Sequence, residues 1–507
     1  MRRAILFITF SVFAVILVNS ACTHKPQVQP VVATAGYPDS VAKILINQCA
    51  TAGCHNQASY QLAAGLLLDS YDHLMAGSNF GAEVVAYSTQ FSRLLAYCNK
   101  YVPSDDTVID PGHITTYPTL QQYNTIKNWI AKGAPDANGA IPFAANSGTR
   151  QKIYLALGST CNQVAVIDAQ SKLVMRYITV GNAQNQVPHD VDVSSDGAYA
   201  YVSIYDGNWL QKIDTRTDTV IGTADLSSLV PSAAEGQWSI INLSPMDTAL
   251  MVSGWLQAGN IATINTASMT INAGQCADAQ NGLGGAIGSF ELPHGIASNA
   301  TFDTFFAALQ YGNVVNKFQF KSPPYVKQVS VKGSTPKIAS QDSTQPGPHQ
   351  IQMSPDHSRY FVTCQFTNEV RVMDAYTDKV LDSIPVGMFP QEMALSLSKG
   401  YLFVVCQNDN TNPTGTGSIY VINYNTMAVV GVMYGVLSKP HDVAVDEQDG
   451  LVFVCSTNLD GHVHHLGYCG GADGWYTVYN LNTLQPADSK IYEVLANPYT
   501  LSTRFKQ

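Results

Sequence analysis

The chain has 507 residues, which is long enough for more than one domain. Hydrophobic residues make up 46% of the sequence and charged residues only 13%, so the composition excludes an intrinsically disordered protein. The formal net charge of −10, without a patch of Lys and Arg, argues against a nucleic-acid-binding surface, so no nucleic-acid partner is expected.

Residues 1–21 have the pattern of a secretory signal peptide, with two arginines, an apolar run over 4–18 and small residues after it. The run is shorter than the roughly 20 residues that a membrane span needs. The residues before Cys22 resemble a bacterial lipoprotein signal, in which this cysteine is acylated. The alternative is ordinary cleavage near Ala21. The sequence therefore predicts an exported protein of the cell envelope, in the periplasm or at the outer membrane, with Cys22 as its lipid anchor in the membrane.

Short helices are predicted over residues 38–135, where apolar residues recur at three- and four-residue intervals. The last of these helices ends at Gly133, with Pro135 just beyond, which is a normal helix stop. Residues 22–37 are rich in Pro and small residues and are predicted to be a tether, and residues 136–150 form a second linker. We therefore expect a small all-α domain between the two.

The segment CATAGCH within this region contains the residues needed for covalent haem attachment. In a haem c, two thiols bond to the haem vinyl groups and the next His is an axial iron ligand, which here indicates Cys49, Cys54 and His55. Four residues separate the two cysteines, whereas the usual spacing is two. The alternative is a Cys49–Cys54 disulfide.

The surrounding sequence, VAKILINQCATAGCHNQASYQLAAGLLLDSY and later TIKNWIAKGAPDANG, resembles a haem-binding cytochrome domain common in envelope proteins of planctomycetes and Bacteroidetes. The resemblance covers roughly residues 38–135 and implies a cytochrome c domain that binds haem c covalently. In that family a Met before the final helix is the sixth iron ligand, and here His113 stands in that region. His113 is therefore the candidate second axial ligand, and His73 is another candidate. The alternative is a surface histidine beside an iron that is five-coordinate or ligated elsewhere.

From Gln151 onward, short strands and turns recur to the end of the chain. A similar first strand recurs at 187–197, 237–247, 292–302, 347–357, 389–400 and 439–450. Residues 497–505 look like a seventh first strand, whose continuation lies at 153–181, at the start of the region. We expect these two segments to share one blade, which closes a ring of seven blades and removes exposed strand edges.

The repeats resemble the YVTN-type β-propeller family, most closely in the segment FVTCQFTNEVRVMDAYTDKVLDSIPVGMFPQEMALS at 361–396. The two resemblances together imply a multidomain chain, with a small all-α cytochrome c domain followed by an all-β seven-bladed propeller over 151–507. They imply no single activity, because propellers of this kind serve many tasks.

One position of the aligned first strands is rich in histidine. The first strands of a propeller line its central channel, so equivalent residues form a ring at one mouth. Four imidazoles in such a ring can bind copper or another transition metal. The alternative is that each imidazole bonds the backbone of a neighbouring blade. The position holds His189, Ser239, His294, His349, Gln391, His441 and Tyr499.

A second cluster lies in a Gly-rich insertion at 460–475, where imidazoles and a thiol stand close together in sequence, as in many metal sites. The alternative is an exposed loop in which Cys455 and Cys469 are paired. The candidate metal ligands are His462, His464, His465 and Cys469.

These features predict electron transfer through haem c, with the propeller docking a redox partner protein or binding a small-molecule substrate. Two alternatives stay open. In the first, the chain is an oxidoreductase with a metal or second cofactor in the propeller funnel, supplied with electrons by the haem. In the second, the propeller binds a ligand at the cell surface and the haem senses redox state.

Overall fold

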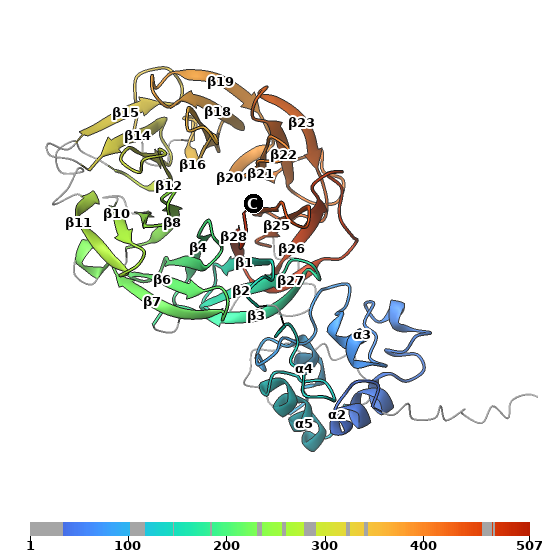
Figure 1. The fold of residues 1–507 in the computed structure, drawn as a ribbon. Coiled ribbons are helices and arrows are strands. Elements are labelled where there is room, and N and C mark those ends of the chain that lie inside the picture. Colours follow the sequence, from blue (N-terminus) through green and yellow to red (C-terminus); the bar gives the residue numbers. More distant parts are fainter. Residues whose placement is uncertain are drawn as a thin grey trace, which may run out of the picture.

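A computed structural model describes residues 34–101, 117–145, 147–182, 185–230, 236–255, 260–277, 290–320, 325–338, 343–458, 469 and 472–506. Its strands form seven four-stranded antiparallel sheets, arranged as blades around a central channel (Figure 1). The prediction of a seven-bladed β-propeller is confirmed.

Six blades each use four consecutive strands, and the first strand of each lies nearest the channel. The first three of them are β4 (Pro188–Val193), β5 (Tyr199–Ile204), β6 (Trp209–Asp214) and β7 (Thr219–Asp225); β8 (Trp238–Leu243), β9 (Ala249–Gly254), β10 (Asn260–Asn265) and β11 (Thr270–Ala277); and β12 (Pro293–Ser298), β13 (Phe305–Leu309), β14 (Val314–Gln319) and β15 (Tyr325–Ser330). A short 3-10 helix, η3 (Ser227–Leu229), follows β7.

The other three of these six blades follow in chain order. They are β16 (Pro348–Met353), β17 (Arg359–Cys364), β18 (Glu369–Asp374) and β19 (Val380–Pro385); β20 (Met388–Ser396), β21 (Tyr401–Asn408), β22 (Ser418–Asn423) and β23 (Ala428–Met433); and β24 (Pro440–Asp446), β25 (Leu451–Ser456), β26 (Asp473–Asn480) and β27 (Tyr492–Ala496).

The seventh blade, which we call the closing blade, combines the two ends of the propeller. Its strand order is β28 (Pro498–Thr503), β1 (Lys152–Leu157), β2 (Gln163–Asp168) and β3 (Leu173–Thr179). Strand β28 pairs antiparallel with β1, and Leu501 lies opposite Leu155. The expectation that the first and last segments share a blade is confirmed, and the ring is closed by backbone hydrogen bonds.

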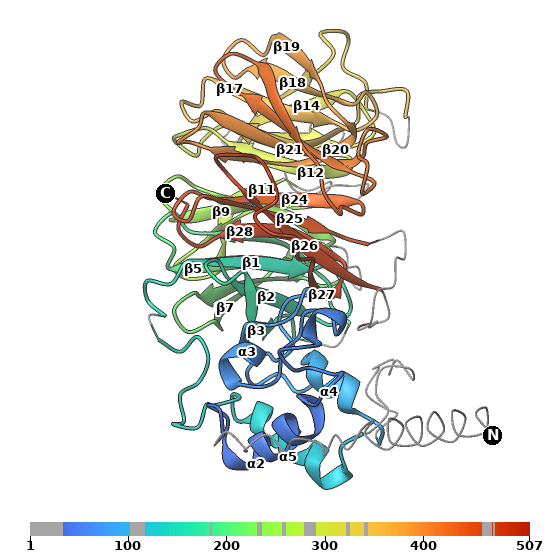
Figure 2. The same cartoon turned by 90° about the vertical axis from the view of Figure 1, so that its right-hand side faces the viewer.

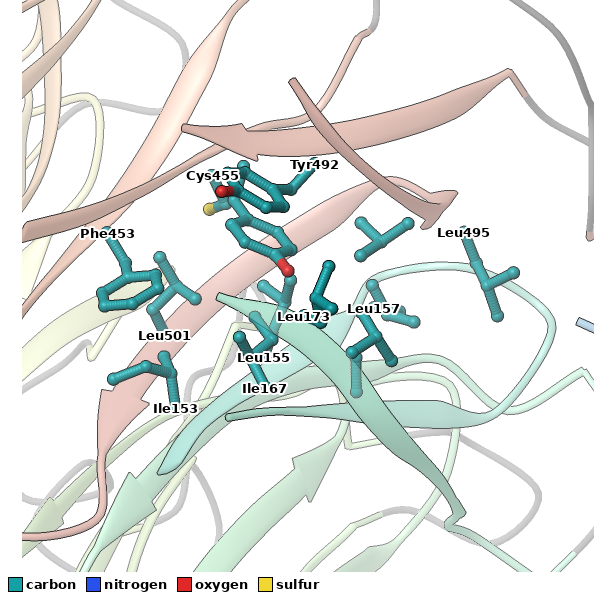
Figure 3. Packing of buried hydrophobic residues seen from close by; sticks show 14 of the residues in the cluster. Ile153, Leu155, Leu157, Ile167, Leu173, Phe453, Cys455, Tyr492, Leu495 and Leu501 are labelled. Carbon is teal, nitrogen blue, oxygen red and sulfur yellow. The ribbon is translucent and has the colours of Figure 1, made fainter. Parts of the chain in front are cut away.

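Apolar packing between neighbouring blades explains why the inner strands read as continuous hydrophobic runs. Every residue of β1 and β2 is buried, because each blade is covered on both faces. Between the closing blade and the β24–β27 blade, Ile153 and Leu155 pack in one cluster with Phe453 and Leu501 (Figure 3). Outer strands alternate instead, as in β7, where exposed and part-buried residues follow one another.

A helical segment precedes the propeller and lies outside the ring, beside β3 and β27 (Figures 1 and 2). None of the helices among the described residues has the length and apolarity needed to cross a membrane. The segment contains α2 (Asp39–Ile44), the π-turn η1 (Leu45–Cys49), the 3-10 turn η2 (Tyr60–Leu62), α3 (Tyr71–Met75), α4 (Arg93–Cys98) and α5 (Leu120–Ala131).

The longest of these helices, α5, is specified by its own ends. Thr119 and Gln122 form a capping box, in which each side chain accepts a hydrogen bond from the other residue's backbone N–H. The helix stops just before Gly133, whose φ of +94° is favourable for glycine. It buries Tyr123, Ile126, Trp129 and Ile130.

The prediction of a small all-α cytochrome c domain is wrong. In the described part of the segment there are four α-helices of 5 to 12 residues, joined by turns and bends. Part of its apolar surface is buried against the propeller, since Val85, Phe91 and Ala96 belong to the same buried cluster as Leu155 and Tyr492. The chain is therefore nearly all β, and the helices are an attachment to the propeller rather than a separate domain.

Backbone and charge contacts hold the segment on the outer edge of the β24–β27 blade. The carbonyl of Phe80 accepts a hydrogen bond from the N–H of Glu493 in β27, at 3.0 Å. The Arg93 guanidinium donates to the Glu493 carboxylate at 2.6 Å, and both side chains are buried. The segment thereby covers an edge strand that would otherwise expose unpaired backbone groups.

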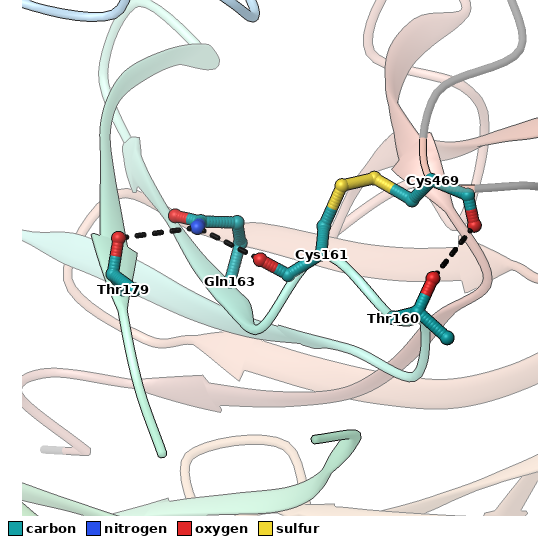
Figure 4. The surroundings of a disulfide bond; sticks show 5 residues. All are labelled: Thr160, Cys161, Gln163, Thr179 and Cys469. Carbon is teal, nitrogen blue, oxygen red and sulfur yellow. Dashed lines mark hydrogen bonds between the residues drawn. A yellow bond between two sulfur atoms is a disulfide. The ribbon is translucent and has the colours of Figure 1, made fainter. Parts of the chain in front are cut away.

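A disulfide joins the closing blade to the β24–β27 blade. It links Cys161, between β1 and β2, to Cys469, and Thr160 donates to the carbonyl of Cys469 at 3.0 Å (Figure 4). The alternative pairing of Cys455 with Cys469 is wrong. Cys455 is a buried free thiol on β25, which lies in the apolar cluster between the two blades.

Candidate functional site

The loop from Cys49 to His55 is a closed turn at the end of the first helix. Helix α2 widens into the π-turn that ends at Cys49, and the N–H of His55 then donates to the carbonyl of Cys49 at 3.1 Å. Gly53 has a φ of +85°, a conformation that side-chain-bearing residues rarely adopt. The turn brings both cysteines and the histidine into one small loop.

Both cysteines of this loop are free thiols, so the alternative of a Cys49–Cys54 disulfide is not found. Cys49 is half-buried against the apolar cluster of the helical segment, and Cys54 is exposed. Burial and the neighbouring Cys54 thiol raise the pKa of Cys49 to about 11. The Cys49 sulfur is therefore a thiol, not a thiolate, at neutral pH.

The imidazole of His55 is held in a defined orientation. Its Nδ1 lies 3.0 Å from the carbonyl oxygen of Leu66. A carbonyl can only accept, so Nδ1 carries the proton and Nε2 carries the lone pair that a metal ion requires. The Leu68 N–H donates to the carbonyl of His55 at 3.0 Å and holds its backbone as well. Two thiols and an oriented imidazole in one turn fit the chemistry of a covalently attached haem.

Several predicted site residues are not part of this geometry. Cys469 is described, but its sulfur is in the disulfide with Cys161 and is not a thiolate ligand in this state. The residues that lie outside the described part of the chain are Cys22, His113, His462, His464 and His465.

The histidine-rich position of the propeller coincides with a β-bulge in each first strand. In the β12–β13 pair, Pro293 lies opposite Leu309 and Ile296 lies opposite Ala307, so three steps on one strand match two on the other. Corresponding shifts occur in the other six blades. A bulge changes the direction of the side chains, so the histidine and the residue after it can both face the channel although they are consecutive in the strand.

Five aromatic rings from these positions form a closed circle in the channel, as the alignment of the first strands predicts. Ser239 and Gln391 occupy the two remaining positions and are buried. The centroid distances around the circle are 5.8 Å for His189–His294, 4.0 Å for His294–His349, 6.2 Å for His349–His441, 3.7 Å for His441–Tyr499 and 4.5 Å for Tyr499–His189.

All four histidines of the circle are neutral at pH 7, because burial lowers the pKa of each. The pKa falls to about 4 for His294 and to about 3 for His441. His441 Nδ1 lies 3.0 Å from the carbonyl oxygen of Tyr499 in the next blade. This contact is the hydrogen bond to a neighbouring blade's backbone that we considered as the alternative to metal binding. The second nitrogen of His441 has no hydrogen-bond partner among the described residues, and neither has Nδ1 of His189, His294 or His349.

A cavity of about 490 Å³ lies in the channel and is lined by the residues that follow the histidine position. Three of them are carboxyl groups, Asp190, Glu392 and Asp442. Burial raises the pKa of all three, to about 7 for Asp190, and the charges of Asp190 and Asp442 raise the pKa of Glu392 further. The N–H of Ile241 donates to Asp190 at 2.7 Å, and that of Leu501 donates to Asp442 at 2.6 Å.

Glu392 is a site residue that the sequence interpretation missed. One ligand atom each from His294, His349 and Glu392 lies within 4.8 Å of the other two, and all three side chains are buried. The signal available in the sequence was the next column of the alignment, which holds Asp190, Gln350, Glu392 and Asp442. Imidazoles are the more distinctive metal ligands, so the sequence pattern indicates the histidine column alone.

No family model matches the chain, and no curated protein matches it. Among solved structures, a functionally unknown protein from Desulfotomaculum acetoxidans DSM 771 is 12% identical, covering 69% of this chain and all of its own, with a TM-score of 0.49. Kuenenia stuttgartiensis hydrazine synthase is 14% identical over 59% of this chain and 81% of its own, with a TM-score of 0.40. A protein of unknown function from Bacteroides caccae is 12% identical over 70% and 99%, with a TM-score of 0.41. These likenesses concern the fold, and no activity follows from them.

Proposed function

We propose that this chain is an electron-transfer protein of the cell envelope that carries haem c on Cys49 and Cys54, with His55 as an axial iron ligand. The observation that carries the proposal is the His55 imidazole, held by Leu66 at 3.0 Å within a turn that also contains two free thiols. Bound haem c supplies one-electron oxidation and reduction of its iron. The propeller offers the surface and channel for a redox partner protein or a small-molecule substrate.

The residues of the loop have distinct roles in this proposal. Each thiol would hold the haem by a thioether, formed by adding the S–H across one vinyl group, and this reaction needs neither a leaving group nor an oxidant. Leu66 accepts the Nδ1 proton of His55, which fixes the ring and makes Nε2 the more basic ligand. In this proposal His113 would be the second iron ligand, and a pair of histidines would give a lower potential than His with Met.

Two features support the proposed location in the envelope. Residues 1–21 have the pattern of an export signal, and Cys22 follows as the proposed lipid anchor in the membrane. The disulfide between Cys161 and Cys469 is of the kind that persists in oxidising compartments and is rare in the cytosol.

Haem attachment is tested by expressing the full chain in a host that matures c-type haem and recording the pyridine haemochrome spectrum. We expect one covalent haem per chain with the bands of a two-thioether haem c. Cys49→Ala and Cys54→Ala should each give a single-thioether spectrum, and the double variant should lose covalent haem. The matched control is Cys98→Ala, which removes a buried thiol of the same segment outside the loop and should keep the haem. Absence of covalent haem from the wild type, or its retention by the double variant, refutes the proposal.

The role of His113 is tested by the midpoint potential. His113→Met should raise the potential, because a thioether stabilises the reduced iron more than an imidazole does. The measurement is a redox titration followed by absorbance, with the spectrum recorded in both states. An unchanged potential and spectrum would remove His113 from the axial position without affecting the assignment of Cys49, Cys54 and His55.

A further inference from the structure

Two unsatisfied buried atoms face one another in the central channel, far from the Cys49 loop in sequence. His349 Nδ1 lies 3.6 Å from Glu392 Oε1, and within the described part of the chain neither atom has a hydrogen-bond partner. Nδ1 of His294 is buried and unpartnered in the same way, and its ring centroid is 4.0 Å from that of His349. Buried polar atoms without partners are costly, so a cation that binds all three would offset this cost.

The spacing of these atoms suits a transition-metal ion. A tetrahedral ion about 2.1 Å from each ligand separates the ligand atoms by about 3.4 Å. The His349–Glu392 pair is already close to that value at 3.6 Å, and all three ligand atoms lie within 4.8 Å of one another. Metal binding therefore requires the ligand atoms to approach one another by no more than about 1.4 Å, from 4.8 Å to about 3.4 Å.

The strands around the site hold the ligands in place. Gln350 donates from Nε2 to Glu392 Oε2, which leaves Oε1 directed to His349. A Cβ atom at Gly295 would lie 2.3 Å from the carbonyl oxygen of His349, so glycine at this position lets β12 approach β16 closely enough for His294 to meet His349. Ser253 donates to the carbonyl of His294 at 2.8 Å and fixes its backbone. Such supporting contacts are typical of built metal sites.

The channel contains carboxyl groups that can supply negative charge to a dication, which displaces their protons when it binds. Three buried carboxyl groups, Asp190, Glu392 and Asp442, line the cavity. Among the described residues that line it, Lys506 alone is a lysine or arginine, and this lysine pairs with Asp192 at 2.5 Å. The inner carboxyl groups therefore lack a cationic side chain of their own.

We propose that His294, His349 and Glu392 bind a divalent transition-metal ion of the zinc type in the propeller channel. Two imidazoles and a carboxylate are an established ligand set for zinc. Glu392 also lines the cavity of about 490 Å³, so a fourth coordination position can face that space. The site uses none of the residues proposed to hold haem, and it does not depend on that proposal.

The test measures Zn²⁺ binding to the full chain after removal of bound metal with a chelator. The background is Cys49→Ala with Cys54→Ala, so that haem iron does not contribute. Calorimetric titration should show one Zn²⁺ per chain, and Co²⁺ should give visible absorption typical of imidazole and carboxylate ligands. Glu392→Gln and His349→Gln should each weaken Zn²⁺ binding on the order of 100-fold. The matched control is His357→Asn, which removes an imidazole that lines the same cavity outside the cluster and should leave binding unchanged.

Each outcome decides the proposal. Circular dichroism establishes that the variants are folded, and Glu392→Gln provides the decisive comparison if His349→Gln does not fold, because its amide oxygen can still accept from Gln350. Stoichiometric binding that Glu392→Gln weakens and His357→Asn does not supports the site. Absence of Zn²⁺ and Co²⁺ binding by the parent protein, or equal binding by parent and Glu392→Gln, overturns it.

Discussion

Lys152 is a fully buried lysine on the inner part of the closing blade. Its ammonium group donates to the carbonyl of Thr215 at 2.7 Å and to both carboxylate oxygens of Asp218 at 2.9 and 2.8 Å. Tyr154 donates to the same carboxylate at 2.7 Å. Because Asp218 lies in the turn between β6 and β7, this network connects two neighbouring blades.

Replacing Asp218 should therefore be strongly destabilising. Asp218→Asn leaves the buried ammonium without a countercharge, and we expect a loss of about 3–5 kcal/mol in the free energy of unfolding. Asn tolerates the φ of 55° at this position. The loss of stability therefore reflects the missing negative charge and not strain in the turn. Urea unfolding followed by fluorescence measures it. The double variant with Lys152→Met should recover much of the loss, and an equally unstable double variant would contradict the explanation.

At the scale of elements, the contact between α4 and β27 contains more negative than positive charge. Arg93 is paired with Glu493 and also interacts with Glu83. Burial and the Glu83 charge raise the pKa of Glu493 to about 7, although Arg93 acts in the opposite direction. A raised pKa in the folded state means that stabilisation is complete below the unfolded value of 4.5 and is lost as the pH rises through about 7.

The attachment of the helical segment should consequently weaken between about pH 5 and 8.5, two values on either side of the folded-state pKa of Glu493 of about 7. Hydrogen exchange of the α4 amides, corrected for the intrinsic effect of pH, measures this change. Glu493→Gln cannot ionise but can still accept from Arg93, so its α4 amides should show little dependence on pH. The same pH dependence in the wild type and in this variant would assign the effect to another group.

At the scale of the whole molecule, the ring depends on β28. This strand pairs with β1 and contributes Leu501 to the cluster between the closing blade and the β24–β27 blade. The disulfide from Cys161 to Cys469 joins the same two blades, and both of its cysteines pack against this cluster. The last residues of the chain thus close the propeller both by pairing and by packing.

Deletion of residues 498–507 should open the ring. It exposes the edge of β1 and the apolar residues behind it, so we expect loss of a cooperative thermal transition and self-association of the product. Calorimetry and light scattering after size exclusion measure both effects. A chain that ends at Phe505 keeps β28 and should behave as the full chain does. A monomeric, cooperatively folded deletion variant would show that the other six blades close without β28.

Much of the propeller and part of the channel can be predicted from sequence, because both depend on local repetition. The recurring first strand determines seven blades, and the split repeat determines that β28 joins β1. Aligned positions in a closed ring must lie at the same level of the channel, which is why His189, His294, His349 and His441 come together. The two free cysteines before His55 can also be recognised from the sequence, since they lie within one short segment of the chain.

The sequence by itself thus determined the repeat, the strands and the histidine circle. Only the tertiary structure decided that Glu392 meets His294 and His349, because that contact depends on bulge geometry and on how closely β12 and β16 approach at Gly295. It also decided that Phe91 packs against the propeller and that Cys161 pairs with Cys469, 308 residues away. The physical reason is the same in each case. A periodic pattern shows which side chains are apolar or reactive, but the surface that buries them is set by contacts between distant segments.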